Sequence, residues 1–202
     1  DCWADLNNDG VINNLDRVKV GNLFPTVTGG FSTTLGYKDF SLYARFDYAL
    51  GHTLYNDLAA RSLGQYQGSF NIIDMVKDSW SETNQNTDIP KFYYADQLSK
   101  KNITRSNFGL TAVDNNSSRF YEKGDYLALR EITLTWNLPK KWINKALMSN
   151  ASVYVTGQNL FYITGYTGVS PEPAVDTTYG QGLDNGRYPT PKTVLLGLSV
   201  TF

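Results

Sequence analysis

The sequence has few cysteines, few histidines and few charges, and each shortage excludes a class of protein. Cys2 is the only cysteine among 202 residues, so an internal disulfide and a cysteine-based metal cluster are both excluded. His52 is the only histidine, which leaves no histidine pair for a metal. Charged residues make up 18%, below the roughly 25% of a soluble domain, and the formal net charge is -1. No nucleic-acid partner is therefore expected.

The chain also lacks a long apolar run and an amino-terminal leader. No stretch of about 18 apolar residues occurs, which excludes a transmembrane helix but not a membrane barrel, whose strands alternate. The sequence begins with Asp1 and carries no signal peptide, so we expect a mature or cleaved segment of something larger. Aromatic residues are abundant at 14%, which suits a surface that meets sugars, a partner or a membrane interface.

Alternation of apolar and polar residues predicts five β-strands, each with one apolar and one polar face. They fall in a hairpin at 26–50, a hairpin at 126–159 and a terminal strand at 192–202. Between them lie two long loops at 51–125 and 160–191, and the segment 1–25 precedes the first strand. Short turns on one rim and long loops on the other are typical of outer-membrane barrels, whose long loops are extracellular. We therefore expect the three long segments to be extracellular.

Aromatic residues are expected at both ends of the apolar faces. The short-turn rim offers Tyr37, Phe40, Trp136 and Phe202, and the opposite rim offers Tyr48, Tyr126 and Phe161. Two such girdles are typical of a lipid-facing barrel wall, because amphipathic rings settle at the headgroup level. The same alternation assigns Arg45, Asp47 and Glu131 to the lumen, and Arg130 to the lipid side near the outer rim.

The alternative fold is a soluble sandwich, whose strands alternate equally well. In that fold the apolar faces pack against a second sheet, whereas in a barrel wall they contact lipid. Leu134, Val153, Leu198 and Phe46 distinguish the two, since a second layer covers them only in the sandwich. The function that accompanies this alternative is a soluble, calcium-dependent adhesion or carbohydrate-binding module at the cell surface.

One local motif predicts a structural calcium site. In "DLNNDGVINNLD", Asp5, Asn7 and Asp9 stand at positions 1, 3 and 5 of an EF-hand-like loop, and Asp16 stands at position 12. Gly10 occupies the sharp turn at position 6, and the carbonyl of Val11 supplies the oxygen at position 7. The alternative is an Asx-rich turn in which the side chains bind their own backbone.

No enzymatic activity is expected. The sequence contains no nucleophile elbow, phosphate loop or metal-hydrolase signature. The carboxylate pairs Glu122 with Asp125 and Glu172 with Asp176 lie in predicted loops, where nothing fixes their separation for glycoside hydrolysis. We therefore predict no catalytic residues.

Several stretches together resemble one family. They are "DLNNDGVINNLDRVKVGNLFPTVTGGF", "YLALREITLTWNLP", "VYVTGQNLFYITGYTGVSPE" and "YPTPKTVLLGLSVTF" with its final Phe202. They resemble the carboxyl-terminal end of SusC/RagA proteins, which are TonB-dependent outer-membrane importers of Bacteroidota. The resemblance implies an all-β chain that supplies the last strands, about five, of a large antiparallel barrel of about 22 strands with a plugged lumen. The plug and the TonB-contacting segment of that family do not occur in this sequence.

The resemblance also implies partners and a cargo. A SusD-like lipoprotein covers the extracellular mouth, the TonB complex drives import, and lipid or lipopolysaccharide surrounds the barrel, whose remaining strands complete the wall. The cargo is a glycan oligomer or a peptide. Loop aromatics that are able to stack on sugar rings, or simply to pack the loops, are Tyr66, Trp80, Tyr93, Tyr94 and Tyr179.

Overall fold

The chain divides into two units, and each has its own β-sheet. The strand unit comprises Pro25–His52, Gly124–Gly165 and Tyr188–Phe202. The loop unit comprises Asp1–Phe24, Thr53–Lys123 and Tyr166–Arg187. The computed structural model describes residues 4–11, 14–60, 62, 74–89, 91, 118–144, 147–172, 182–186 and 188–202.

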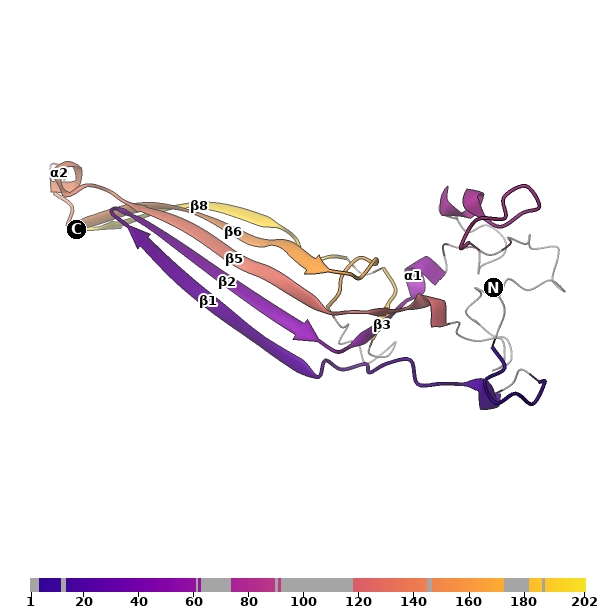
Figure 1. Cartoon of the computed structure of the whole chain (residues 1–202). Coiled ribbons are helices and arrows are strands. Elements are labelled where there is room, and N and C mark those ends of the chain that lie inside the picture. The colour runs from indigo at the N-terminus through magenta and orange to yellow at the C-terminus, as the bar shows by residue number, and fades with distance from the viewer. Residues whose placement is uncertain are drawn as a thin grey trace. The chain divides into compact units, whose positions relative to one another are not determined.

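The strand unit is an antiparallel sheet in which neighbours in the sequence are neighbours in space (Figure 1). The strand order is β1-β2-β5-β6-β8, and the bounds are Val27–Tyr37, Phe40–Leu50, Tyr126–Asn137, Asn150–Thr164 and Thr193–Thr201. These are the five strands that the alternation predicts. Strands β5 and β6 are joined through the short helix α2 (Lys140–Ile143).

The two faces of this sheet differ as the alternation predicts. Phe31 of β1 stacks on Phe46 of β2 with ring centroids 5.0 Å apart. Among the residues that distinguish a lipid-facing wall from a sandwich, Leu134 is 44% exposed and Leu198 is 65% exposed, while Val153 and Phe46 are partly exposed. A second layer over this face would bury all four, so the prediction of an uncovered apolar face is confirmed.

A β-bulge on β5 changes the faces of two residues. The register between β2 and β5 shifts between Arg45 and Phe46, so that Arg130 is an extra residue on β5. Because the side-chain period of a strand is two, one extra residue moves every following side chain to the other face. The prediction that Arg130 faces lipid is therefore wrong, since its side chain lies on the polar face beside Asp47.

The same shift makes the placement of Tyr126 in the outer aromatic girdle wrong. Tyr126 pairs with Ala49 and Thr164 on the polar face, and its ring meets that of Tyr162 edge-on at 5.8 Å. The other rim assignments keep their phase. Phe40 stacks on Trp136 at 6.1 Å at the short-turn end, and Phe161 pairs with Leu129 on the apolar face.

The loop unit is built around a small sheet that the sequence does not predict. Its order is β4-β3-β7, with β3 at Thr53–Asn56, β4 at Tyr121–Lys123 and β7 at Leu183–Asp184. Strand β3 pairs antiparallel with β4 and parallel with β7, so the two long loops share one sheet. Within the described part of this unit, the helical segments are α1 (Asp57–Ala60) and the 3-10 turns Asn14–Asp16, Asp74–Asp78 and Ser118–Phe120.

A small apolar core supports this sheet. Tyr55, Ala60 and Phe120 are buried together, with Ile89 and Leu183 among the side chains packed against them. Tyr55 meets Phe120 edge-on at 6.4 Å. The core therefore contains residues from both long loops.

None of the helices in the described part of the chain has the length and apolar character needed to span a membrane.

A glycine in β8 makes room for an aromatic ring. Gly197 lies opposite Tyr154 in the β6–β8 pair, and a Cβ at Gly197 would meet the Tyr154 ring. Glycine in a strand interior otherwise weakens the strand, so its presence here marks a close approach. Gly36 in β1 differs, since a Cβ there would meet no described atom within 4 Å.

We expect Gly197→Ala to destabilise the sheet by roughly 1–3 kcal/mol, because the added methyl group displaces the Tyr154 ring. Gly36→Ala is the matched control, and its open site predicts no loss. The measurement is the urea midpoint of the protein refolded in detergent micelles. Equal midpoints for the two variants would contradict the packing of Tyr154 on Gly197.

Candidate functional site

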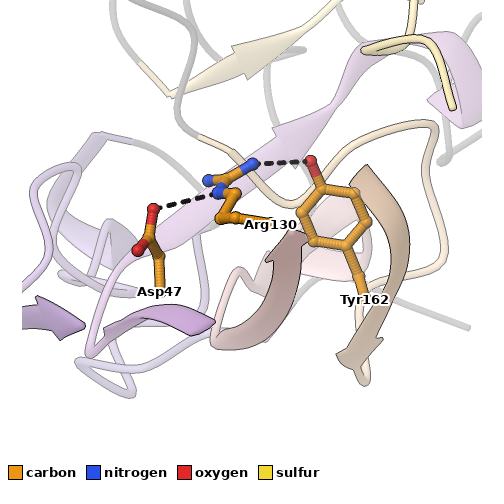
Figure 2. A network of polar contacts seen from close by, with 3 residues as sticks. All are labelled: Asp47, Arg130 and Tyr162. Atoms are coloured by element: carbon orange, nitrogen blue, oxygen red, sulfur yellow. Dashed lines mark hydrogen bonds and ion pairs between the residues drawn. The ribbon is translucent and has the colours of Figure 1, made fainter. Parts of the chain in front are cut away.

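The polar face of the strand unit carries a charged network across three neighbouring strands (Figure 2). The Nε of Arg130 on β5 donates to Oδ2 of Asp47 on β2 at 3.0 Å. Its NH1 group donates to the hydroxyl oxygen of Tyr162 on β6 at 3.3 Å, and the guanidinium lies 5.8 Å from the centroid of that ring. Figure 2 shows Arg130 between its two partners.

This network explains how the bulge is held. The side chain of Arg130 is only 16% exposed and that of Asp47 is 41% exposed, so the ion pair is partly shielded from solvent. Charge-assisted hydrogen bonds of this kind are about twice as strong as neutral ones. The extra residue of β5 thus supplies the donor that ties β2, β5 and β6 together. Asp47 lies on the polar face, to which the alternation assigns it, and there it pairs with Arg130.

Hydroxyl groups continue the polar face toward the middle of the sheet. The Oγ1 atoms of Thr133 and Thr156 lie 2.8 Å apart, and Thr133 also donates to Oε1 of Glu131 at 3.2 Å. Thr156 is buried. The face is therefore polar and hydrogen-bonded, as expected of a wall that lines a wet interior.

In the loop unit, two carboxylates hold one segment of the second long loop. Glu122 accepts hydrogen bonds from the backbone N–H and the hydroxyl of Thr167, at 2.9 and 2.8 Å, and from Nδ2 of Asn56 at 3.0 Å. Asp184 accepts from the Tyr166 hydroxyl at 2.7 Å and from the N–H groups of Val169 and Gly186. Such bonds fix the segment 166–169 on both sides.

Burial changes the acidity of two tyrosines in this unit. Burial raises the pKa of Tyr166 well above its ordinary value, and the hydrogen bond to Asp184 and the negative charges of Asp184 and Glu122 raise it further. Burial also raises the pKa of Tyr121. Tyr166 therefore acts as a neutral donor, and the carboxylates act as anchors for the loop. Glu122, one of the carboxylates for which no catalytic role is predicted, has this anchoring role, while Asp176 lies outside the described residues.

The predicted calcium loop closes on its own backbone. Asp5 accepts hydrogen bonds from the N–H groups of Asp9 and Gly10, and Asp9 accepts from the N–H of Val11 and from Nδ2 of Asn7. Asp16 reaches back to accept from the N–H of Leu6 at 2.9 Å, which closes the loop. Gly10 has a φ of 81° at the sharp turn.

These bonds are the ones that an Asx-rich turn requires. Carboxylate oxygens have further lone pairs, so the same arrangement leaves acceptors for a hard cation. Among the described residues, no group of three or more His, Cys, Asp or Glu side chains is gathered as a metal site. Calcium binding by Asp5, Asn7, Asp9, Val11 and Asp16 stays a prediction.

Of the five loop aromatics named above as able to stack on sugars or to pack the loops, only Trp80 lies in the described part of the chain. Its indole is 38% exposed, and Nζ of Lys91 lies 5.6 Å from the ring centroid. The backbone N–H of Trp80 donates to the carbonyl of Ile89 at 2.8 Å. A sugar stacking on this ring would compete with Lys91 on the face that the ammonium covers. Tyr66, Tyr93, Tyr94 and Tyr179 lie outside the described residues.

His52 shows what residue patterns alone do not reveal. The sequence indicates only an ordinary loop residue after a strand, whereas His52 is 1% exposed and its ring meets Tyr126 edge-on at 6.2 Å. A Cβ at Gly124 would meet the His52 ring, so the glycine permits this packing. The feature of the sequence that could have indicated this packing is Gly124 itself, which precedes the third predicted strand.

We expect Tyr166→Phe to destabilise the loop unit by about 1.5–3 kcal/mol at neutral pH, because Asp184 loses a donor. The raised pKa also predicts a pH dependence. The stabilisation is complete below the unfolded-state pKa of about 10 and is lost as pH rises above it toward the folded-state value.

Thermal melts between pH 7 and 11 measure both effects. Tyr188→Phe is the matched control, since Tyr188 is 97% exposed, and it is expected to leave the melting profile unchanged. An alkaline loss of stability that is the same in the wild type and in Tyr166→Phe would contradict the assignment.

No protein-family model matches the chain, but individual proteins and structures do. The chain is 31% identical to "TonB-dependent receptor P3" of Formosa agariphila, over 100% of this chain and 19% of that protein. It is 33% identical to "TonB-dependent receptor P26" of the same organism, over 99% of this chain and 19% of that protein. It is 25% identical to "TonB-dependent receptor SusC" of Bacteroides thetaiotaomicron, over 99% of this chain and 17% of that protein.

Solved structures agree with the curated relatives. The "RagAB peptide importer in the 'closed-closed' state" matches with a TM-score of 0.66 and 26% identity, over 89% of this chain and 18% of that one. The chain thus spans less than a fifth of the relatives and structures reported above. Its up-and-down sheet, its two contrasting faces and these matches along nearly all of this chain identify it as a segment of a SusC/RagA-family TonB-dependent receptor.

Proposed function

We propose that the chain forms part of the wall of an outer-membrane TonB-dependent importer and supplies its carboxyl-terminal strands. The observation that carries this proposal is the contrast between the two faces of the five-stranded sheet. Leu196 and Leu198 on one face are 80% and 65% exposed, while Asp47, Arg130 and Tyr162 on the other are joined by hydrogen bonds. A barrel wall needs an apolar outside and a polar inside.

The orientation in the membrane follows from the connections. Strand β1 passes to β2 through Lys38 and Asp39 alone, and β5 passes to β6 through α2, all at one end of the sheet. Both long loops leave from the other end. In outer-membrane barrels the short turns are periplasmic and the long loops extracellular. The loop unit would then lie outside the cell, where cargo arrives.

The proposed cargo is a glycan oligomer or a peptide, taken up with a SusD-like surface lipoprotein. Support for a peptide comes from the matched structure, which is described as a peptide importer. Support for a glycan comes from the aromatic residues in the sequence of the long loops, such as the partly exposed Trp80, since aromatic rings offer an apolar face to sugars. The extracellular loops would meet the lipoprotein or the cargo. The remaining strands, the plug and the TonB contact belong to the rest of the receptor, and lipid or lipopolysaccharide would contact the outer face.

The rival function, a soluble calcium-dependent adhesion or carbohydrate-binding module, makes a different demand on the sheet. It needs a second layer over the apolar face, because a soluble protein of this size buries such a surface. The exposure of Leu134, Leu196 and Leu198 argues against that fold.

Two adjacent leucines of β8 test the proposed wall. Leu196 pairs with Val155 on the apolar face, and Leu195 pairs with Thr156 on the polar face. In the intact receptor we expect Leu196→Arg to destabilise the barrel by about 2–4 kcal/mol, as a cation does at mid-membrane on a lipid-facing site. The matched Leu195→Arg is expected to be tolerated, because its side chain faces water.

The readouts are the amount of folded receptor in the outer membrane and growth on the cargo as sole carbon source. Growth on glycan oligomers or on peptides separates the two cargo classes. Equal loss, or equal retention, of folded receptor in the two variants would contradict a lipid-facing Leu196. Normal uptake by a strain that lacks the receptor would contradict the importer function.

We also propose that the acidic loop binds calcium in a structural role. Addition of EGTA is expected to lower the melting temperature of the receptor, and calcium is expected to restore it, since a ligand that binds only the folded state stabilises it. Asp9→Asn removes one carboxylate and is expected to abolish the calcium-dependent shift. Asp39→Asn, in the two-residue turn of the strand unit, is the matched control. A melting curve that chelation leaves unchanged would contradict the site.

A further inference from the structure

The apolar face of the strand unit continues past the strand ends onto helix α2. Trp136, near the end of β5, stacks on Phe40 with ring planes inclined by 11°. On its other side, Trp142 of α2 meets Trp136 edge-on, with centroids 5.9 Å apart and planes inclined by 83°. Trp142 is 56% exposed. A row of three rings thus runs from the lipid-facing sheet to the short-turn end.

The position of Trp142 is fixed by the hairpin that carries α2. The N–H of Trp142 donates to the carbonyl of Pro139 at 2.8 Å, and Nζ of Lys140 donates to the carbonyl of Ser149 at 3.0 Å. Ile143, the next residue, is 1% exposed. Ile143 is buried and both ends of the turn are hydrogen-bonded. The backbone that carries the exposed indole of Trp142 is therefore fixed in position.

Positive charge surrounds this row of rings. The described residues of the two short connections carry three lysines, Lys38, Lys140 and Lys141, and one acidic side chain, Asp39. All three lysines are exposed, and Nζ of Lys38 lies 5.3 Å from the centroid of the Tyr37 ring. Tyr37, Leu147 and Phe202, at the same end of the sheet, are 71%, 88% and 89% exposed. The surface therefore combines large apolar groups with a positive rim.

We propose that α2 and the turn between β1 and β2 form an interfacial anchor that binds the phosphate headgroups of anionic phospholipids. The anchor faces the leaflet on the short-turn side. Tryptophan prefers the headgroup level, where its ring is in hydrocarbon and its N–H is in water. Lysine side chains near the end of a spanning segment extend to the same level, where they attract lipid phosphate. This inference rests on the proposed function, because it requires the sheet to cross a bilayer.

Fluorescence quenching in the intact receptor tests where Trp142 lies. The receptor is reconstituted in vesicles of phosphatidylcholine with one-third phosphatidylglycerol, in which the acyl chains are brominated near the headgroup or near the bilayer centre. The fluorescence lost in Trp142→Phe and in Trp136→Phe gives the signal of each indole. We expect Trp142 to be quenched most by bromine near the headgroup.

Lipid retention tests the headgroup chemistry. Native mass spectrometry counts the phosphatidylglycerol molecules that remain on the receptor after transfer from mixed micelles. Each surface lysine is expected to contribute about five-fold to anionic lipid binding at low salt. Two such contributions multiply, so the double variant Lys38→Gln with Lys141→Gln is expected to bind anionic lipid roughly 25-fold more weakly and to retain correspondingly less. Lys192→Gln replaces an exposed lysine that precedes β8, away from the short connections, and it is the matched control, expected to retain as much as the wild type.

Three results separate the anchor from the importer. If Trp136 is quenched by brominated lipid while Trp142 is quenched only by aqueous acrylamide, the anchor is wrong and the membrane-spanning wall stands. If neither indole is quenched by lipid, the proposed function itself fails. If the double lysine variant retains as much phosphatidylglycerol as Lys192→Gln does, the headgroup assignment is wrong even where Trp142 lies at the interface.

Discussion

A strand that crosses hydrocarbon has no water to receive its backbone hydrogen bonds, so every N–H and C=O must find a partner in a neighbouring strand. The strand unit meets this requirement by regular antiparallel pairing through β2, β5 and β6. Strands β1 and β8 are the outermost strands of the sheet in the described chain. The rest of the receptor must therefore meet these two edges. Hydrocarbon also disfavours charged side chains, so apolar residues alternate with polar ones along each strand.

Much of the sheet could be predicted from the sequence, because a period of two is visible residue by residue. All five strands and the apolar face follow from it. The bulge at Arg130 could not be predicted, since one extra residue within "LALREITL" leaves the alternation looking regular on each side. That one residue reverses the faces of Arg130 and Tyr126. The charged network on the polar face, which depends on the bulge, was hidden for the same reason.

The loop unit was harder to predict because its structure depends on distant pairing. Strands β3, β4 and β7 are short, and β3 and β7 come from different loops. No local pattern announces a parallel pair between Tyr55 and Leu183. The anchoring roles of Glu122 and Asp184 are equally hidden, since their partners lie 45 and 18 residues away along the chain. By contrast, the turn of the acidic loop follows directly from its spacing of Asp, Asn and Gly.

The pairing of β3 with β7 means that the two long loops do not fold independently of each other. Two insertions that are far apart in the sequence share backbone hydrogen bonds and one apolar core. They form a single folded body, and a change of length or shape in one alters the support of the other. A chimera that takes only one of them from a relative would therefore replace one partner of the β3–β7 pair and part of the shared apolar core, while leaving the other partner unmatched.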